Sequence, residues 1–234
     1  MNYPQLKVTV ESAESAQATQ DLAFPIRRLI CSGWVGRDPV ALQEHIDELA
    51  EHGVPPPTRI PIFMNFSPYL VTTSDAVDVV SSESSGEVEY VVLKDGDRVY
   101  LGVGSDHTDR GFEKYSIPAS KQMYAKVVAP AVWPYAEAQG HWDRIIVRSW
   151  SWTNGIRTLY QEAALATILN PDELLDQLPT GDGLTTEGFV LFSGTPATLT
   201  GLAFGEAFDF EMEDPVLGRT IRHGYQVHVL PQYN

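Results

Sequence analysis

Short apolar segments divided by glycine and proline run through this chain of 234 residues, and they restrict its fold more than any other feature. Residues 6–10, 87–93 and 98–103 have the length and composition of β-strands, and 18 Gly and 16 Pro interrupt such segments throughout. The regular strand-helix alternation that builds a parallel doubly wound sheet is missing from the pattern. The sequence therefore predicts a strand-rich, mixed α+β fold.

The clearest helix is predicted to begin after Asp38 and to stop at Gly53. Asp38 is a favourable N-cap, Pro39 suits the first turn, and apolar residues recur at helical spacing from 40 to 49. Two more helical segments are predicted at residues 161–169 and 171–178, and a strand is predicted at residues 142–150. Because the sequence contains neither a repeat nor a long linker, we expect one domain over residues 1–234.

Net charge and cysteine content limit which binding partners and which cellular compartment are expected for this protein. With 16 Lys+Arg against 31 Asp+Glu, the formal net charge is −15, which repels phosphate backbones and anionic membranes. We therefore expect no nucleic-acid and no membrane partner. Cys31, the single cysteine, cannot form an internal disulfide, and its apolar neighbours favour a buried structural thiol over a nucleophile. The amino-terminal segment has no apolar core typical of a signal peptide, so we expect a cytoplasmic protein.

Three carboxylates are placed so that they can converge. Glu87 and Glu89 are two residues apart at the start of a predicted strand, where residues i and i+2 share a face. Asp106 follows the return strand of a hairpin whose turn is Lys94-Asp95-Gly96-Asp97. Three carboxylates without paired His or Cys suit a hard cation such as Mg²⁺, Mn²⁺ or Ca²⁺. The competing interpretation is an acidic strand end that is merely solvated.

Other polar groups are candidates for chemistry, each with a plainer alternative. His45 and Glu48 lie three apart on one helix face, so the carboxylate can orient the imidazole as a base, although such pairs also occur by chance. Lys121 is predicted in a polar turn, and the polar run at 106–110 suits either a site or a surface turn. The turn at 193–196 can present N–H groups and a hydroxyl to an anion, or it can be an ordinary turn.

Taken in this order, these features resemble the fumarylacetoacetate hydrolase superfamily. The resemblance covers residues 36–230. Its motifs are His45-Ile46-Asp47-Glu48, Pro61-Ile62-Phe63, Glu87-Val88-Glu89, Asp106 with Arg110, Lys121, Asn154-Gly155 followed by Gln161, and Gly194-Thr195-Pro196.

The resemblance implies a mixed β-roll like the carboxy-terminal domain of that superfamily, and a homodimer. The single catalytic domain would comprise residues 1–35 as amino-terminal strands and loop and 36–230 as the superfamily-like core. Mg²⁺ or Mn²⁺ would be held by Glu87, Glu89 and Asp106. The implied catalytic residues are His45, Glu48 and Lys121, and the implied substrate-binding residues are Arg110, Gln161 and Thr195.

The implied activity is that of a metal-dependent enzyme acting on a small 2-oxo or 2,4-dioxo acid. We expect hydrolytic C–C cleavage of an acylpyruvate-like substrate through a metal-bound enolate, with His45 and Glu48 activating water. Decarboxylation, isomerisation or hydration on the same site, and a catalytically silent binding or scaffold protein, are the alternatives. Three departures from the superfamily pattern, at Asn65, Glu113 and Tyr124, leave the substrate open.

Overall fold

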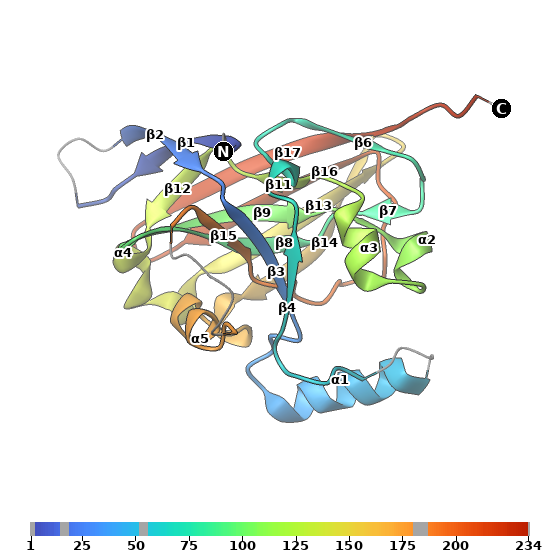
Figure 1. The fold of residues 1–234 in the computed structure, drawn as a ribbon, viewed down its shortest axis with the longest axis horizontal. Helices are drawn as coiled ribbons and strands as arrows, with labels where there is room; N and C mark the ends of the chain where they lie inside the picture. Colours follow the sequence, from blue (N-terminus) through green and yellow to red (C-terminus); the bar gives the residue numbers. More distant parts are fainter. Residues whose placement is uncertain (1–2, 15–18, 52–55, 180–186, 234) are drawn as a thin grey trace.

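The structure is a computed structural model that describes residues 3–14, 19–51, 56–179 and 187–233, without the side chains of residues 45 and 48–51. Two β-sheets pack against each other, and the helices lie at their periphery (Figure 1). The larger sheet contains β1 (Gln5–Glu11), β2 (Thr19–Pro25), β3 (Arg28–Gly33), β4 (Ile62–Phe66), β5 (Val71–Thr72), β8 (Val88–Asp95), β9 (Arg98–Asp106), β11 (Lys126–Val128), β12 (Ala131–Pro134) and β15 (Phe189–Phe192). The smaller sheet contains β6 (Ala76–Val79), β13 (Ile146–Thr153), β14 (Ile156–Ala164), β16 (Ala207–Asp214) and β17 (Arg219–Val229). This architecture confirms the predicted strand-rich, mixed α+β class.

Mixed strand directions link segments that are far apart in sequence. The larger sheet has the order β2-β1-β12-β9-β8-β15-β3-β4, with β11 pairing β9 and β5, and the smaller has the order β14-β13-β16-β17-β6. A separate two-stranded ladder joins β7 (Ser84–Ser85) to β10 (Thr108–Asp109). Parallel pairs such as β15 with β3 lie beside antiparallel pairs such as β15 with β8.

The hairpin of β8 and β9 forms the centre of the larger sheet. Gly96 makes its tight turn with φ of 63°, a conformation that glycine adopts at no steric cost. Val88, Tyr90 and Val92 enter the hydrophobic core between the two sheets, whereas Val91 and Leu93 enter a second core on the other face. Since β8 is buried on both faces, its side chains are largely apolar. Glu89 is the one acidic residue in the buried part of this strand.

Helices flank the sheets and carry some of the predicted site residues. They are α1 (Pro39–Glu51), α2 (Arg110–Glu113), α3 (Ile117–Gln122), α4 (Tyr135–Gln139) and α5 (Pro171–Asp176), with 3-10 turns at Pro68–Leu70, Trp142–Arg144 and Leu165–Thr167. In α1 the predicted N-cap is present, because Asp38 Oδ1 accepts the N–H of Val40 at 2.9 Å. No helix in the described part of the chain has both the length and the apolarity that a membrane crossing requires.

Two of the predicted elements are wrong in part. Residues 161–169, predicted as helix, instead finish β14 and enter a 3-10 turn. The ladder to β13, with Ser149 opposite Gln161, and the burial of Tyr160 outweigh the helix preference of the Ala- and Leu-rich segment. The strand predicted from residue 142 begins only at Ile146, after a 3-10 turn.

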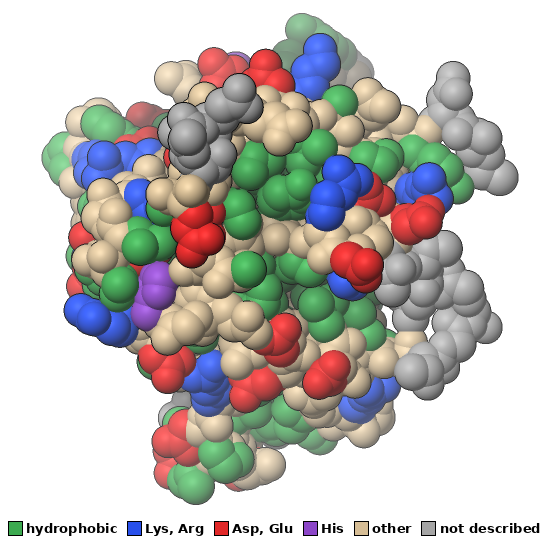
Figure 2. Space-filling view, turned by 90° about the vertical axis from the view of Figure 1, so that its left-hand side faces the viewer, with side chains coloured by type: hydrophobic (Ala, Val, Ile, Leu, Met, Phe, Trp, Pro, Cys, Tyr) green, Lys and Arg blue, Asp and Glu red, His purple; other side chains and the backbone are tan. Residues whose placement is uncertain are grey.

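The surface carries the chain's net charge of −15 in dispersed form. On the face shown in Figure 2, acidic and basic side chains are interspersed among hydrophobic ones. A shallow hollow of about 350 Å³ lies beside β1 and β9, and none of the predicted site residues lines it. The three predicted carboxylates lie instead at the other end of the central hairpin, where β8 begins and β9 ends.

Candidate metal centre

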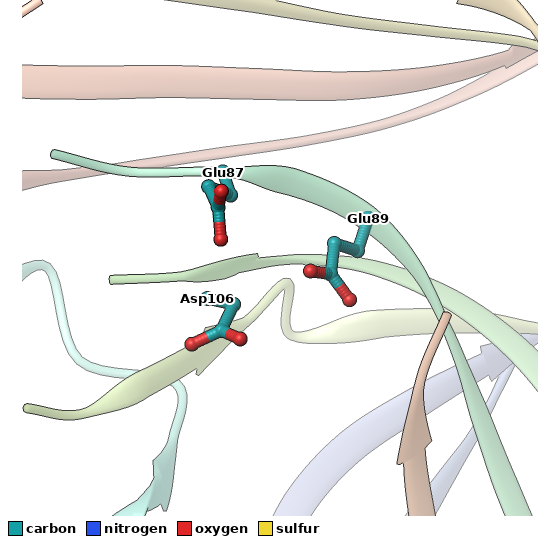
Figure 3. Close-up of side chains that lie close together, drawn as sticks. All are labelled: Glu87, Glu89 and Asp106. Carbon is teal, nitrogen blue, oxygen red and sulfur yellow. The ribbon is translucent and has the colours of Figure 1, made fainter. Parts of the chain in front are cut away.

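The ends of β8 and β9 bring the three predicted carboxylates together. Glu89 is paired with Gly104 across the hairpin, and the N–H of Asp106 donates to the carbonyl of Glu87 at 2.9 Å. One carboxylate oxygen from each of Glu87, Glu89 and Asp106 lies within 4.8 Å of the others, and the side chains converge in Figure 3. The convergence that strand periodicity and hairpin return predicted is thus present.

These carboxylates are buried, not solvated. The side chain of Asp106 is fully buried, that of Glu87 is 13% exposed, and Glu89 is 1% exposed as a residue. Burial of charge without a partner is costly, so a solvated strand end no longer accounts for them. All three donors are hard oxygens, which is the donor set that Mg²⁺, Mn²⁺ and Ca²⁺ prefer. The residues present therefore fit a divalent cation.

Three basic side chains balance the three acids. Lys121 Nζ lies 2.7 Å from Glu87 Oε2 and 2.7 Å from Asp106 Oδ2. Lys126 Nζ lies 2.5 Å from Asp106 Oδ1, and Arg110 Nη2 lies 2.8 Å from Glu87 Oε1. With all six of these side chains ionised their charges sum to zero, and a divalent cation would add positive charge to the centre of an acidic protein.

The surroundings separate the pKa values of the carboxyl groups. Burial opposes ionisation of Asp106, but Lys121 and Lys126 outweigh it and hold the pKa of Asp106 well below its usual range. Burial raises the pKa of Glu89 well above its usual range, and the Asp106 carboxylate raises it further. The N–H of Gly194 donates to Glu89 Oε2 at 2.7 Å and favours the ionised form only in part. Glu89 is the group whose ionisation a cation would assist most.

Lys121 reaches the carboxylates from a short helix and not from the predicted polar turn. Ser116 caps α3 by accepting the N–H of Ala119 at 3.3 Å, and Lys121 lies in its last turn. Burial works against the ammonium, yet the Asp106 and Glu87 carboxylates outweigh burial and raise the pKa of Lys121. The lysine is therefore a fixed positive charge beside the carboxylates.

The proposed base lies outside the described side chains. His45 and Glu48 fall within α1, whose backbone is helical as predicted, but their side chains are among those that the structure does not describe. Their roles as general base and orienting carboxylate stay a prediction.

Arg110 and Gln161, predicted to bind substrate, have partners within the protein. Arg110 donates from Nη1 to Glu113 at 2.9 Å and from Nε to Ser85 at 2.7 Å, in addition to its ion pair with Glu87. Gln161 accepts from Val88 N at 3.0 Å and from Ser149 Oγ at 2.9 Å. Through these contacts, both side chains connect the segments that form the site. Their substrate-binding roles stay predictions.

The turn after β15 lies against the start of β8, beside the carboxylate cluster. Gln161 Nε2 donates at 2.7 Å to Thr195 Oγ1 and at 2.7 Å to the carbonyl of Pro196, and Thr195 Oγ1 donates to the carbonyl of Val88 at 3.0 Å. Gly194 has φ of 92°, and an added Cβ would lie 2.8 Å from Val35. The anion that this turn receives is the Glu89 carboxylate, and substrate binding by Thr195 stays a prediction.

Sequence reasoning missed part of the site. Lys126 is fully buried, and its Nζ donates to the carbonyl of His107 at 2.8 Å as well as pairing with Asp106. A lysine within the apolar run 125–129 was the available signal, because lysine is rarely buried without a partner. His107 is also fully buried, and burial followed by the charge of Lys126 lowers its pKa to about 3. The surface-turn alternative for residues 106–110 is wrong, since residues 106–109 are buried.

Cys31 has the structural role that was expected. The thiol is fully buried in the second hydrophobic core, and burial, followed by the nearby Asp106 carboxylate, raises its pKa well above the usual value. A thiol in this state is a poor nucleophile.

The fold is shared with solved structures described as fumarylacetoacetate hydrolase family proteins, as the sequence resemblance implied. One structure with the fold is 2-keto-3-deoxy-D-arabinonate dehydratase in its apo form, at 14% identity and a TM-score of 0.65 over 92% of this chain and 77% of the other. The same dehydratase complexed with magnesium and 2,5-dioxopentanoate matches at 16% identity with a TM-score of 0.61 over 92% and 77% of the two chains. A yeast fumarylacetoacetate hydrolase family protein matches at 14% identity with a TM-score of 0.56 over 89% and 95%.

The chain belongs to the family described as "Protein of unknown function (DUF2848)", whose model matches residues 32–225. No curated protein matches the chain in sequence. Identities of 14–16% to the solved structures establish the shared fold and leave the reaction to be argued from the site.

Proposed function

We propose that the protein is a divalent-metal-dependent enzyme acting on a 2-oxo or 2,4-dioxo acid, with hydrolytic C–C cleavage of an acylpyruvate-like substrate as its reaction. The observation that carries the proposal is the buried cluster of Glu87, Glu89 and Asp106 with Lys121 Nζ 2.7 Å from two of the three. In support, a dehydratase with this fold is described as complexed with magnesium and a dioxo acid.

Glu87, Glu89 and Asp106 would hold Mg²⁺ or Mn²⁺. The cation would supply Lewis acidity, which lowers the energy of negative charge on the 2-oxo oxygen of the substrate. Lys121, which pairs with Asp106 Oδ2, would add positive charge near that oxygen of the substrate, and Lys126 pairs with the other carboxylate oxygen, Asp106 Oδ1. The local positive charge then attracts an acidic substrate against the net charge of −15.

In the proposed hydrolysis, His45 takes a proton from water while Glu48 orients the imidazole. The water oxygen bonds to the distal carbonyl carbon, and the bond from that carbon to the neighbouring methylene breaks. Its electron pair enters the enolate of the 2-oxo acid, which a proton from solvent or His45 converts to the ketone. General-base assistance of this kind contributes about 10²–10⁴-fold.

The test is a screen of 2-oxo and 2,4-dioxo acids with added Mg²⁺, which follows loss of enol absorbance and release of CO₂ together. Turnover of a 2,4-dioxo acid without CO₂ supports hydrolysis, and CO₂ release indicates a decarboxylase. Glu89→Gln and Asp106→Asn should abolish metal-dependent turnover. The matched control is Asp95→Asn, at the other end of β8, where the carboxylate pairs with Arg98 at 2.6 Å on the surface. Undiminished turnover in excess chelator would contradict the metal role.

A second candidate is dehydration of a 2-keto-3-deoxy sugar acid, which the fold shared with 2-keto-3-deoxy-D-arabinonate dehydratase favours. Adding a 2-keto-3-deoxy sugar acid to the screen separates the two candidates, and His45→Ala tests the hydrolysis mechanism. Under the hydrolysis mechanism the variant loses C–C cleavage but still exchanges deuterium at C3 of a 2-oxo acid with Mg²⁺ present. A silent scaffold protein exchanges no deuterium. The proposed homodimer is checked separately by light scattering of the purified chain.

A further inference from the structure

A buried chain of hydrogen bonds lies behind the carboxylates and joins the two sheets. The N–H of Glu87 donates to Ser105 Oγ at 3.2 Å, Ser105 Oγ lies 2.9 Å from the Tyr225 hydroxyl, and that hydroxyl lies 2.9 Å from His107 Nδ1. Ser105, His107 and Tyr225, here called the Tyr225 network, are at most 3% exposed. The network is therefore part of the interior and is shielded from water.

Each contact of the network involves the backbone of Glu87 or a chain neighbour of Asp106, two carboxylates of the proposed metal site. Ser105 and His107 are the two neighbours of Asp106 along the chain. Because side chains alternate along a strand, theirs point toward the smaller sheet while that of Asp106 points away. Tyr225 lies on β17 of the smaller sheet, so a single hydroxyl connects that sheet to both sides of Asp106 and, through Ser105, to the peptide of Glu87.

Packing leaves the network little room to move. The ring of His107 meets the rings of Tyr225 and Phe208 edge-on, with centroid separations of 5.6 Å and 5.8 Å. A Cβ added at Gly86 would lie 2.5 Å from the Tyr225 hydroxyl and 2.7 Å from Ser105 Oγ. Glycine precedes Glu87 because two hydroxyl groups fill the space that a side chain would need.

We propose that Tyr225 is a positioning residue that sets the separation of Glu87 and Asp106 for a small divalent cation. This inference rests on the proposed function, because it takes the carboxylates as metal ligands. Tyr225 touches neither carboxylate. It acts by fixing Ser105 and His107, so its loss should loosen the geometry of the ligands without removing one, and such outer contacts typically change metal affinity by about 10–100-fold.

The test is calorimetric titration of chelator-treated protein with MgCl₂ or MnCl₂ alone. Tyr225→Phe keeps the ring and removes only the hydroxyl, and we expect about 10–100-fold weaker binding at unchanged stoichiometry. The matched control is Tyr135→Phe in α4, which removes a buried tyrosine hydroxyl that donates to Asp172 at 2.9 Å. Both variants lose a hydrogen bond and some stability, so a merely structural role of Tyr225 would affect metal binding in both alike.

A folded Tyr225→Phe variant that binds metal within twofold of the wild type overturns the inference and leaves the proposed function intact. Equal weakening in Tyr135→Phe overturns it as well. If Tyr225→Phe does not fold, the same metal titration is made on Ser105→Ala. This variant removes the oxygen that accepts the Glu87 N–H and contacts Tyr225, so the same loss of metal affinity is expected. A wild-type chain that binds neither Mg²⁺ nor Mn²⁺ overturns the proposed metal role, and this inference with it.

Discussion

Replacing the buried Lys126 with methionine tests the electrostatic balance of the centre most directly. The ammonium group has no exposed surface, lies 2.5 Å from Asp106 Oδ1 and donates to the carbonyl of His107 at 2.8 Å. Methionine has a similar length and fills the same apolar space, so Lys126→Met removes the charge and leaves the packing largely unchanged. Asp106 then keeps Lys121 as its single cationic neighbour among the contacts described.

Removing one partner of a buried ion pair costs about 3–5 kcal/mol, and here the buried Asp106 carboxylate loses one of its two lysine partners. In a chain of this size, each kcal/mol lowers the melting temperature by about 2–4 °C, so Lys126→Met should melt about 6–20 °C below the wild type. The carbonyl of His107 also loses its donor, which places the expected loss toward the upper part of that range.

The assays are urea unfolding for the free energy and thermal unfolding for the melting temperature, both in the presence of chelator and followed by tryptophan fluorescence. The matched control is Lys94→Met on β8, where the ammonium donates to the carbonyl of Gly96 at 2.9 Å and has no ion pair with the described residues; the change should stay within about 0.5 kcal/mol. In a double-mutant cycle, Asp106→Asn combined with Lys126→Met should cost less than the sum of the single changes.

A loss below about 1 kcal/mol for Lys126→Met would refute this account of the site, because a buried pair cannot be broken so cheaply. Additivity of the two single changes would refute it too, since uncoupled residues are not charge partners.

Further predictions concern the turn at Gly194, an alkaline titration and the metal. Gly194→Ala should destabilise the protein by about 1–3 kcal/mol in thermal unfolding, because φ is 92° and the new Cβ would meet Val35; an unchanged melting temperature would count against the geometry of the turn. Burial and the hydrogen bond to Asp109 raise the pKa of Tyr124 to about 12, so its contribution to stability is complete below about pH 10 and is lost as the pH rises toward 12. The phenolate absorbance at 295 nm of wild type minus Tyr124→Phe should reveal this late titration, and a midpoint near 10 would contradict it. Added Mg²⁺ at one hundred times its Kd should stabilise the wild type by about 2.7 kcal/mol and leave Glu89→Gln nearly unaffected, which differential scanning fluorimetry measures.

Local chemistry allowed much of the site to be predicted from the sequence. Alternating apolar residues and the Lys94-Asp95-Gly96-Asp97 turn specify the β8–β9 hairpin, because strand period and turn conformation depend on neighbours along the chain. The return of that hairpin places Asp106 beside Glu87 and Glu89, so the carboxylate cluster follows from spacing within one local unit.

Contacts between distant segments could not be predicted in this way. Residues 161–164 form a strand because β13 pairs with them, although their local preference is helical. Arg110 and Gln161 have the chemistry of substrate-binding groups, yet the structure gives them internal partners. Only the packing of β17 against β9 places a tyrosine hydroxyl behind Asp106.

The sequence by itself determined the fold class, the central hairpin and the three acidic side chains at its end. Tertiary structure alone decided that these acids are buried, that Lys126 balances them alongside Lys121, and that Tyr225 holds their backbone. The physical reason is that hydrogen bonding within a hairpin depends on residues close in sequence, whereas burial and charge pairing depend on which remote surfaces exclude water together.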